Sequence, residues 1–186
     1  MAQEALIDPL IETGRYRVRL AADAADLARA QVLRARLFRG DPGAADADAF
    51  DPLCRHVLVE DKASGTLVCT YRLLDLSDGS RIGDSYSAQF YELAPLRAFT
   101  GRMVEMGRFC IAPEVRDADV LRLAWGALTR IVEADGIEML FGCSSFHGTD
   151  EADFLDAFAL LKDRHIAPRK WLPRVKAPEV FRFCLL

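Results

Sequence analysis

The spacing of apolar and polar residues predicts a chain of mixed strands and helices. Residues 15–20 alternate strictly between the two kinds, which predicts a strand. Residues 55–74 contain two apolar runs joined by a short turn, which predicts a hairpin. Between these strands, apolar side chains at helical spacing predict a helix that ends near Arg39, and Asp23 or Asp26 can cap its start. The inner face of this helix is expected to contain Leu27, Ala30, Leu33, Leu37 and Phe38.

The second half of the chain again combines alternating and helical spacing of apolar residues. Asp117 or Asp119 can cap a helix that Gly136 ends, and Thr149 or Asp150 can cap a later one. The predicted elements are a strand at 103–111, a helix at 120–134, a strand at 137–143, a helix ending near Arg164 and a last strand from Val180.

Residues 40–52 combine glycines, prolines and acids, which predicts a mobile loop. The chain shows no repeat and no linker, and 186 residues are enough to bury one core. We therefore expect a single α/β domain that covers residues 1–186.

The predicted strand at 103–111 contains residues that a buried strand normally avoids. Glu105 and Arg108 carry charges that are unfavourable to bury without a partner, and strict alternation would place them on opposite faces. Gly107 indicates a bulge at Met106-Gly107, which would bring both charges to one side and leave backbone N–H groups unpaired. These features are typical of an active site, although a buried ion pair that only stabilises the sheet has the same residues.

Composition narrows the functional classes. A net charge of −4 argues against nucleic acid as a main partner. No apolar run is long enough to span a bilayer, and the first residues lack the features of a signal peptide. The five cysteines form no CxxC motif and the three histidines are scattered, which predicts reduced thiols and no metal site. We expect a cytoplasmic protein with at most peripheral contact with the inner face of the membrane.

Two motifs resemble the ornithine-lipid N-acyltransferases, bacterial enzymes that attach a 3-hydroxy fatty acyl group to ornithine. They are Glu-x-Gly-Arg-Phe-Cys-Ile-x-Pro at 105–113 and the run at 143–150. The first is also similar to the Glu-x-x-Arg-Phe of the acyl-homoserine-lactone synthases, and the segment Leu33–Phe38 resembles a motif of these synthases. The resemblance implies the GCN5-related acetyltransferase (GNAT) fold, a mixed and mostly antiparallel sheet with one splayed, bulged strand pair, flanked by helices.

The resemblance implies transfer of the acyl group from a thioester to the α-amino group of ornithine or a similar amino acid. The pantetheine arm of the donor would enter between the strands at 103–111 and 138–143. Glu105 is then the candidate general base, Arg108 pairs with it or positions the acceptor carboxylate, and a backbone N–H at the Met106-Gly107 bulge faces the thioester oxygen.

The acceptor and acyl chain would be held by residues from several segments. Arg72 can bind a carboxylate in a bidentate pair or pair with Asp75. Asp48 and Asp51 match an acidic pair of both families and could attract the acceptor ammonium. The other substrate-binding candidates from the matched motifs are Phe109, Ser145 and Phe146.

The donor is expected to be acyl carrier protein rather than coenzyme A, with no tightly bound cofactor. Of the phosphate-binding loop of the fold only Arg116 is present, and Asp117 and Asp119 occupy positions where a pyrophosphate would bind. The residues from Arg164 to Leu186 contain six basic residues and one acid. The dock for the acidic carrier protein is expected at Arg169, Lys170 and Arg174, although anionic lipid could use the same charges.

Two other functions remain open at this point. An acyl-homoserine-lactone synthase would share the donor but use S-adenosylmethionine, and a non-catalytic acyl-binding module would keep the fold without turnover. The motif at 143–150 and the glycine before Arg108 favour the lipid enzymes over the synthases.

Overall fold

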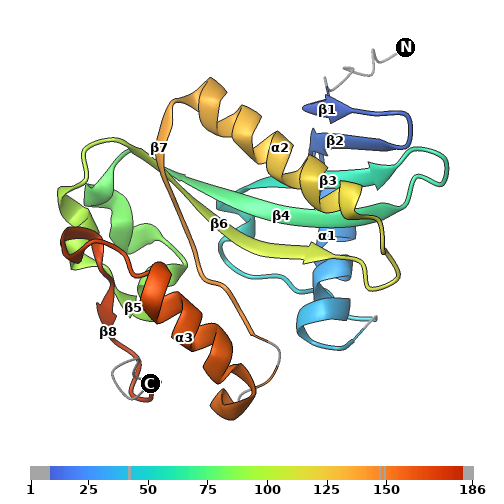
Figure 1. The fold of residues 1–186 in the computed structure, drawn as a ribbon. Coiled ribbons are helices and arrows are strands. Elements are labelled where there is room, and N and C mark those ends of the chain that lie inside the picture. The colour runs from blue at the N-terminus through green and yellow to red at the C-terminus, as the bar shows by residue number, and fades with distance from the viewer. Residues whose placement is uncertain (1–8, 42, 147, 149, 182–186) are drawn as a thin grey trace.

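A six-stranded sheet forms the centre of the molecule, with strand order β1-β2-β3-β4-β6-β7 (Figure 1). The structure is a computed structural model that describes residues 9–41, 43–146, 148 and 150–181. Neighbouring strands pair antiparallel except β6 and β7, which are parallel. The strands are β1 (Ile11–Glu12), β2 (Tyr16–Leu20), β3 (Arg55–Asp61), β4 (Leu67–Leu76), β6 (Arg102–Ile111) and β7 (Ile137–Phe141).

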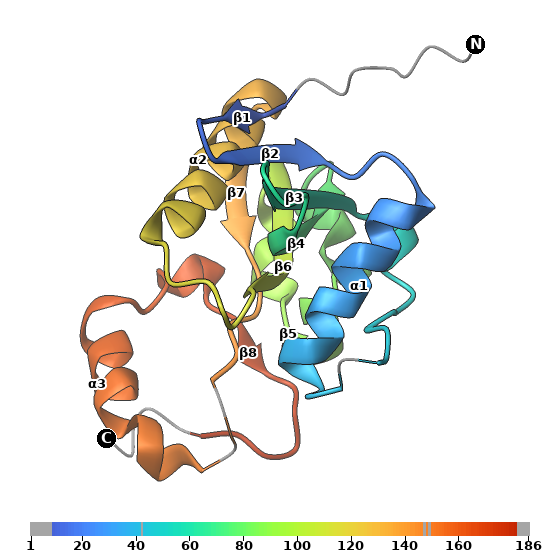
Figure 2. The ribbon, with the colours of Figure 1, turned by 90° about the vertical axis from the view of Figure 1, so that its right-hand side faces the viewer.

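Two helices cover opposite faces of this sheet (Figure 2). Helix α1 (Ala24–Phe38) begins after Asp23, whose side chain accepts a hydrogen bond from the backbone of Asp26. Helix α2 (Ala118–Asp135) is capped in the same way by Asp117. Gly136 ends α2 in the left-handed conformation, with a φ of 62°.

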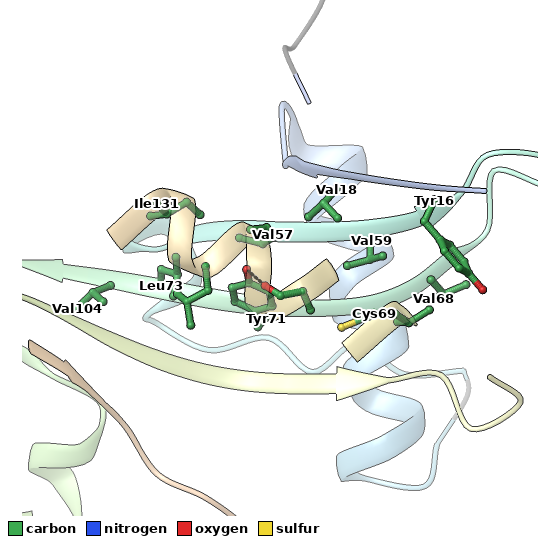
Figure 3. Close-up of a cluster of buried hydrophobic side chains, with 14 of the residues drawn as sticks. Tyr16, Val18, Val57, Val59, Val68, Cys69, Tyr71, Leu73, Val104 and Ile131 are labelled. Carbon is green, nitrogen blue, oxygen red and sulfur yellow. Dashed lines mark hydrogen bonds between the residues drawn. The ribbon is translucent and has the colours of Figure 1, made fainter. Parts of the chain in front are cut away.

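The central strands are buried on both faces because each face lies under a helix. Val57 and Val59 of β3 belong to the apolar cluster under α2 (Figure 3), whereas Leu58 between them packs with α1. On β4, the Tyr71 hydroxyl donates a hydrogen bond of 2.9 Å to the Ala124 carbonyl of α2. Burial of these apolar side chains, at about 25 cal/mol per Å², holds β4 between the two helical layers.

The remaining elements lie beyond the main sheet, and all of them except the third α-helix are short. A second sheet pairs β5 (Tyr91–Glu92) with β8 (Arg174–Val175), and α3 (Leu155–Arg164) has no buried residue. The 3-10 turns are at Asp51–Leu53, Gly79–Asp84, Ser87–Gln89, Ala94–Ala98, Glu151–Phe154 and Arg169–Trp171. None of the described helices has both the length and the apolar character that crossing a bilayer requires.

Most predicted elements are confirmed, with three exceptions. Phe38, expected on the inner face of α1, is 44% exposed, while Arg34 lies on that face and is 1% exposed. The loop at 40–52 is anchored in its second half, since Asp46 and Asp51 are buried and ion-paired. The last strand was expected from Val180, but residues 180 and 181 form no strand and residues 182–186 lie outside the described part of the chain. The alternative cap Thr149 also lies outside it, and Asp150 caps the turn before α3.

Candidate active site

Strands β6 and β7 diverge in the middle of the molecule. Their parallel ladder ends at the pair Glu105 and Phe141, although β6 continues to Ile111. We call the point where they separate, at Met106 and Gly142, the fork. A Cβ placed on Gly142 would lie 2.2 Å from the Met106 carbonyl oxygen, so the two backbones meet there without room for a side chain. The expected splay between 103–111 and 138–143 is therefore confirmed.

The predicted bulge exists but lies two residues further along the chain. Gly107 pairs regularly with Arg72, and Cys110 pairs with Thr70, so the extra residue falls in the Arg108-Phe109 step. Arg108 itself adopts a left-handed φ of 55°, which is unusual for a residue other than glycine. The predicted position at Met106-Gly107 was wrong because the pairing of β6 with β4, and not the presence of a glycine, decides where the ladder is interrupted.

A cavity of about 820 Å³ opens where the strands diverge. The part of β6 from Glu105 to Phe109 lines it, so Glu105 and Arg108 face one space as expected. Tyr86 contributes from the segment between β4 and β6, Trp125 from α2, and Ser145 from the segment after β7. The lining combines aromatic side chains with a few charged groups, which is the usual make-up of a small-molecule site.

Glu105 is buried at 4% exposure and accepts hydrogen bonds on both carboxylate oxygens. The backbone N–H of Tyr86 lies 2.7 Å from Oε2, and the backbone N–H of Ser87 lies 2.7 Å from Oε1. The Ser87 hydroxyl also donates to Oε1 and lies 3.1 Å from the Cys143 sulfur. Glu105 thus holds the turn that carries Tyr86 against the fork, while its side chain stays at the cavity surface.

The two cysteines that line the cavity are thiols at neutral pH. Burial raises the pKa of Cys54 to about 11 and also raises the pKa of Cys143. A thiol is a much weaker nucleophile than a thiolate. Neither sulfur is therefore activated as a nucleophile at neutral pH.

A buried ion-pair network lies behind the cavity and supports Arg108. Arg72 makes a bidentate pair with Asp48, at 2.6 and 2.8 Å, and a bond of 2.6 Å to Asp51. Arg34 of α1 joins Asp51, at 2.7 Å, to Asp46, at 3.0 Å. Arg108 donates from Nε to Asp46 at 2.8 Å and from Nη2 to Asp48 at 3.3 Å.

The network changes two expectations. Arg72 does not pair with Asp75, which instead binds Arg55 at 2.6 Å. Asp48 and Asp51 are bound to arginines and do not line the cavity, so they are not free to attract an ammonium group. Burial alone would raise the pKa of both carboxyl groups, but hydrogen bonds from the arginines outweigh it and hold each pKa below its usual value.

We expect the fold to lose stability as the pH falls below about 5. Arg19 lowers the pKa of Asp26 to about 2, and the pKa values of Asp46 and Asp51 are also lowered. Each folded-state pKa lies below the unfolded value of about 4, so the stabilisation is complete above pH 4 and is lost as the pH falls towards the folded values. Urea unfolding at a series of pH values measures this slope.

The variant Asp51→Asn should be less stable at pH 7 and should show a shallower dependence on pH. The exposed Asp84→Asn provides the control and should change neither quantity by much. A wild-type stability that stays constant from pH 6 to pH 3 would contradict this account of the network.

The other predicted site residues divide into two groups. Phe109 lines the cavity and stacks on Tyr71 with ring centroids 5.6 Å apart, and Ser145 also lines it. Phe146 does not line it and packs instead on Phe154 and Phe158, with centroids 4.8 and 5.2 Å away. Gly107 lies at the cavity surface, where an added Cβ would make an ordinary contact of 3.7 Å with Arg72.

The residues expected to bind the donor lie at the surface. Arg116 donates to the carbonyl oxygens of Pro113 and Val115, and the side chain of Asp117 already caps α2. Arg169, Lys170 and Arg174 are exposed, as expected, the first two in a 3-10 turn and the third in β8. Because β8 pairs with β5, whose Tyr91 lines the cavity, Arg174 lies near the cavity, whereas Arg169 and Lys170 belong to the turn that packs against Ala94–Ala98.

Sequence reasoning missed Tyr86, whose ring packs against two guanidinium groups. The ring centroid lies 5.6 Å from the Arg72 guanidinium carbon and 5.1 Å from that of Arg108. Arg34 was also missed, although its position four residues after Ala30 places it on the inner stripe of α1. An arginine within an apolar stripe is a signal that sequence reasoning could have used.

Comparison with known proteins agrees with this geometry. The family described as "Acetyltransferase (GNAT) domain" matches residues 28–126. L-ornithine N(alpha)-acyltransferase of Rhodobacter capsulatus is 37% identical over 176 residues, which cover 87% of this chain and 68% of that protein. Three further proteins of that name are 30 to 35% identical, and the chain spans 54 to 64% of their length.

Two solved structures share the fold at low sequence identity. The acyl-homoserine-lactone synthase LasI superimposes with a TM-score of 0.52 at 18% identity, over 69% of this chain and 72% of that one. FeeM, an N-acyl amino acid synthase from uncultured soil microbes, gives 0.53 at 18% identity, over 80% of this chain and 78% of that one. With the splayed strands and the matched relatives, these similarities show that the chain belongs to the L-ornithine N(alpha)-acyltransferase family of GNAT-fold acyltransferases.

Proposed function

We propose that this protein transfers a fatty acyl group from a thioester to the α-amino group of ornithine or a similar amino acid. The observation that carries the proposal is the cavity at the β6–β7 fork, into which Glu105 and Arg108 both face. The relatives named L-ornithine N(alpha)-acyltransferase support the same reaction as a step of ornithine-lipid synthesis.

In the proposed reaction the acceptor nitrogen attacks the thioester carbonyl carbon, the new C–N bond forms and the C–S bond breaks. The amine arrives as an ammonium, and Glu105 takes its proton directly or through a water molecule. Backbone N–H groups of β6 beyond the end of the β7 ladder stabilise the oxyanion. The second proton that the nitrogen loses as the amide forms passes to the departing thiolate. Arg108 rather than Arg72 positions the acceptor carboxylate, because the Arg72 side chain is 4% exposed whereas that of Arg108 is 21% exposed and reaches the cavity.

We assign acyl carrier protein as the donor and not coenzyme A. The first turn of α2, where the fold would bind a pyrophosphate, presents the carboxylates of Asp117 and Asp119. A carrier protein brings a single phosphodiester and a folded acidic surface. The exposed Arg169, Lys170 and Arg174 complement such a surface, and Arg174 lies near the cavity.

Reversing these three charges to glutamate is expected to lower kcat/KM with acyl carrier protein by roughly tenfold or more at low salt, since steering by charge raises association rates by that order. The loss should shrink as salt is raised to about 0.1 M and beyond. With acyl-coenzyme A as donor, the same variant should change little.

The matched control reverses Arg17, Arg36 and Arg130, which are exposed at other places on the surface. This variant has the same change in net charge and should retain its activity with both donors. An equal loss with the two donors, or no loss with either, would exclude Arg169, Lys170 and Arg174 as the carrier-protein dock.

Lipid extracts test the proposed function as a whole. Bacteria that produce the protein should accumulate N-acyl-ornithine or the lipid made from it, and cells with Glu105→Gln should not. Mass spectra that show no new acylated amino acid would argue against the proposed activity.

A further inference from the structure

Arg39 and Arg108 bind the two oxygens of one buried carboxylate. Arg39 donates from Nε to Oδ1 of Asp46 at 3.1 Å, and its Nη2 lies 3.0 Å from the same oxygen. Arg108 donates from Nε to Oδ2 at 2.8 Å. Asp46 is 2% exposed and therefore holds the two guanidinium groups together at the wall of the cavity, which both arginines line.

The two arginines come from distant parts of the chain and are placed by independent restraints. Arg39 is the residue after the last turn of α1, where its backbone N–H donates to the Ala35 carbonyl at 3.0 Å. Arg108 is set by the left-handed bulge in β6. The half-exposed Arg39 side chain contrasts with that of Arg72, which is 4% exposed and bound by Asp48 and Asp51.

The charges along the cavity wall favour an anion. Among the described residues that line it, the charged groups are Arg39, Arg72, Arg108, Asp46 and Glu105. Asp48 and Asp51 neutralise Arg72, so the cations still accessible from the cavity are Arg39 and Arg108. Both of those carboxylates already accept hydrogen bonds, Asp46 from arginines and Glu105 from the turn at Tyr86. A carboxylate can therefore be neutralised at this wall, whereas a second ammonium group would find no unengaged carboxylate among these residues.

We propose that Arg39 and Arg108, joined through Asp46, form a two-arginine clamp for the α-carboxylate of the acceptor. This inference rests on the proposed function and adds Arg39 as a binding residue and Asp46 as a positioning residue. Two guanidinium groups can bind the two carboxylate oxygens with charge-assisted hydrogen bonds. The acceptor is then selected by its carboxylate, and a positive charge on its side chain contributes little.

Kinetics with three acceptors test the clamp. They are ornithine, ornithine amide, in which the carboxylate is replaced by a neutral group, and norvaline, which lacks only the side-chain amine. Ornithine amide should have a kcat/KM at least about a hundredfold lower than ornithine, because two charged hydrogen bonds are lost. Norvaline should stay within about tenfold of ornithine, since no charge pair is lost.

The variant Arg39→Gln should raise the KM for ornithine by about tenfold or more with a smaller effect on kcat. It should have little effect on the already poor reaction of ornithine amide. The control is Arg36→Gln on the same helix, because Arg36 pairs with Glu114 at 3.1 Å and does not line the cavity. Equal rates with ornithine and its amide, a loss of more than a hundredfold with norvaline, or matching behaviour of the two variants would overturn the proposal.

A binding measurement tests the clamp separately from the proposed function. If no acceptor is acylated, the proposed function fails, but calorimetric titration with ornithine and ornithine amide still tests the clamp. Binding of ornithine that Arg39→Gln weakens, without matching binding of the amide, would support it. Ornithine binding that is absent, or that Arg39→Gln leaves unchanged, would overturn it.

Discussion

Replacing Glu105 with glutamine is expected to lower acyl transfer by roughly a hundredfold or more, the usual scale for the loss of a general base. The side chain lines the cavity, and its carboxylate accepts from the backbone N–H groups of Tyr86 and Ser87. Glutamine keeps the size of the side chain but cannot take the proton of the acceptor ammonium. Its NH₂ group would also face one of these N–H donors, so the turn that carries Tyr86 should loosen.

Two further measurements separate the loss of the base from the loss of the turn. An acceptor whose amine is unprotonated at neutral pH, such as a hydrazine analogue, needs no base, so the Gln variant should recover most of its rate with it. Ser87→Ala removes one donor to Glu105 and leaves the carboxylate in place, so its rate should fall much less. Full activity of the Gln variant with ornithine would mean that solvent and not Glu105 takes the proton, because Asp48 and Asp51 do not line the cavity.

Adding a single methyl group at Gly142 is expected to damage both stability and activity. The Cβ of Gly142→Ala would lie 2.2 Å from the Met106 carbonyl oxygen, a backbone atom that can move only if the fork itself moves. We expect a loss of roughly 1–3 kcal/mol in the free energy of unfolding, the usual range for overpacking. Because Met106 lies between Glu105 and the bulge, kcat should fall by at least about tenfold as the reacting groups move apart.

Urea unfolding and steady-state kinetics on the same preparation measure both effects. The matched control is Gly83→Ala, where an added Cβ meets nothing within 4 Å and the backbone has no positive φ. A Gly142→Ala protein with wild-type rate and stability would mean that the close approach at the fork has no functional importance.

The sequence predicted the fold well because the periods of apolar residues correspond directly to the layers. The alternation through Val57, Leu58 and Val59 is the reason that β3 lies between two helices. The motif at Glu105–Pro113 likewise identified the strand that carries the site. The position of the bulge could not be predicted from the sequence of β6 alone, because it depends on which residues of β6 lie opposite Tyr71 of β4.

The polar network behind the site was beyond sequence reasoning for a different reason. Asp46 lies in a loop with several acidic residues, and nothing local indicates that this one binds three arginines. Tyr86 lies in an irregular segment without periodicity, and its backbone N–H is held at the site by Glu105. Such pairings join residues far apart in the chain, and only the folded arrangement identifies them.

The most direct test of the proposed activity is the reaction of the purified protein with 3-hydroxyacyl carrier protein and ornithine. Released thiol and amide product should be followed together, and tandem mass spectrometry should locate the acyl group. We predict one amide formed for each thiol released, with the acyl group on the α-nitrogen and no requirement for S-adenosylmethionine. Thiol release without an amide, acylation only when S-adenosylmethionine replaces ornithine, or binding of the donor without turnover would contradict the account.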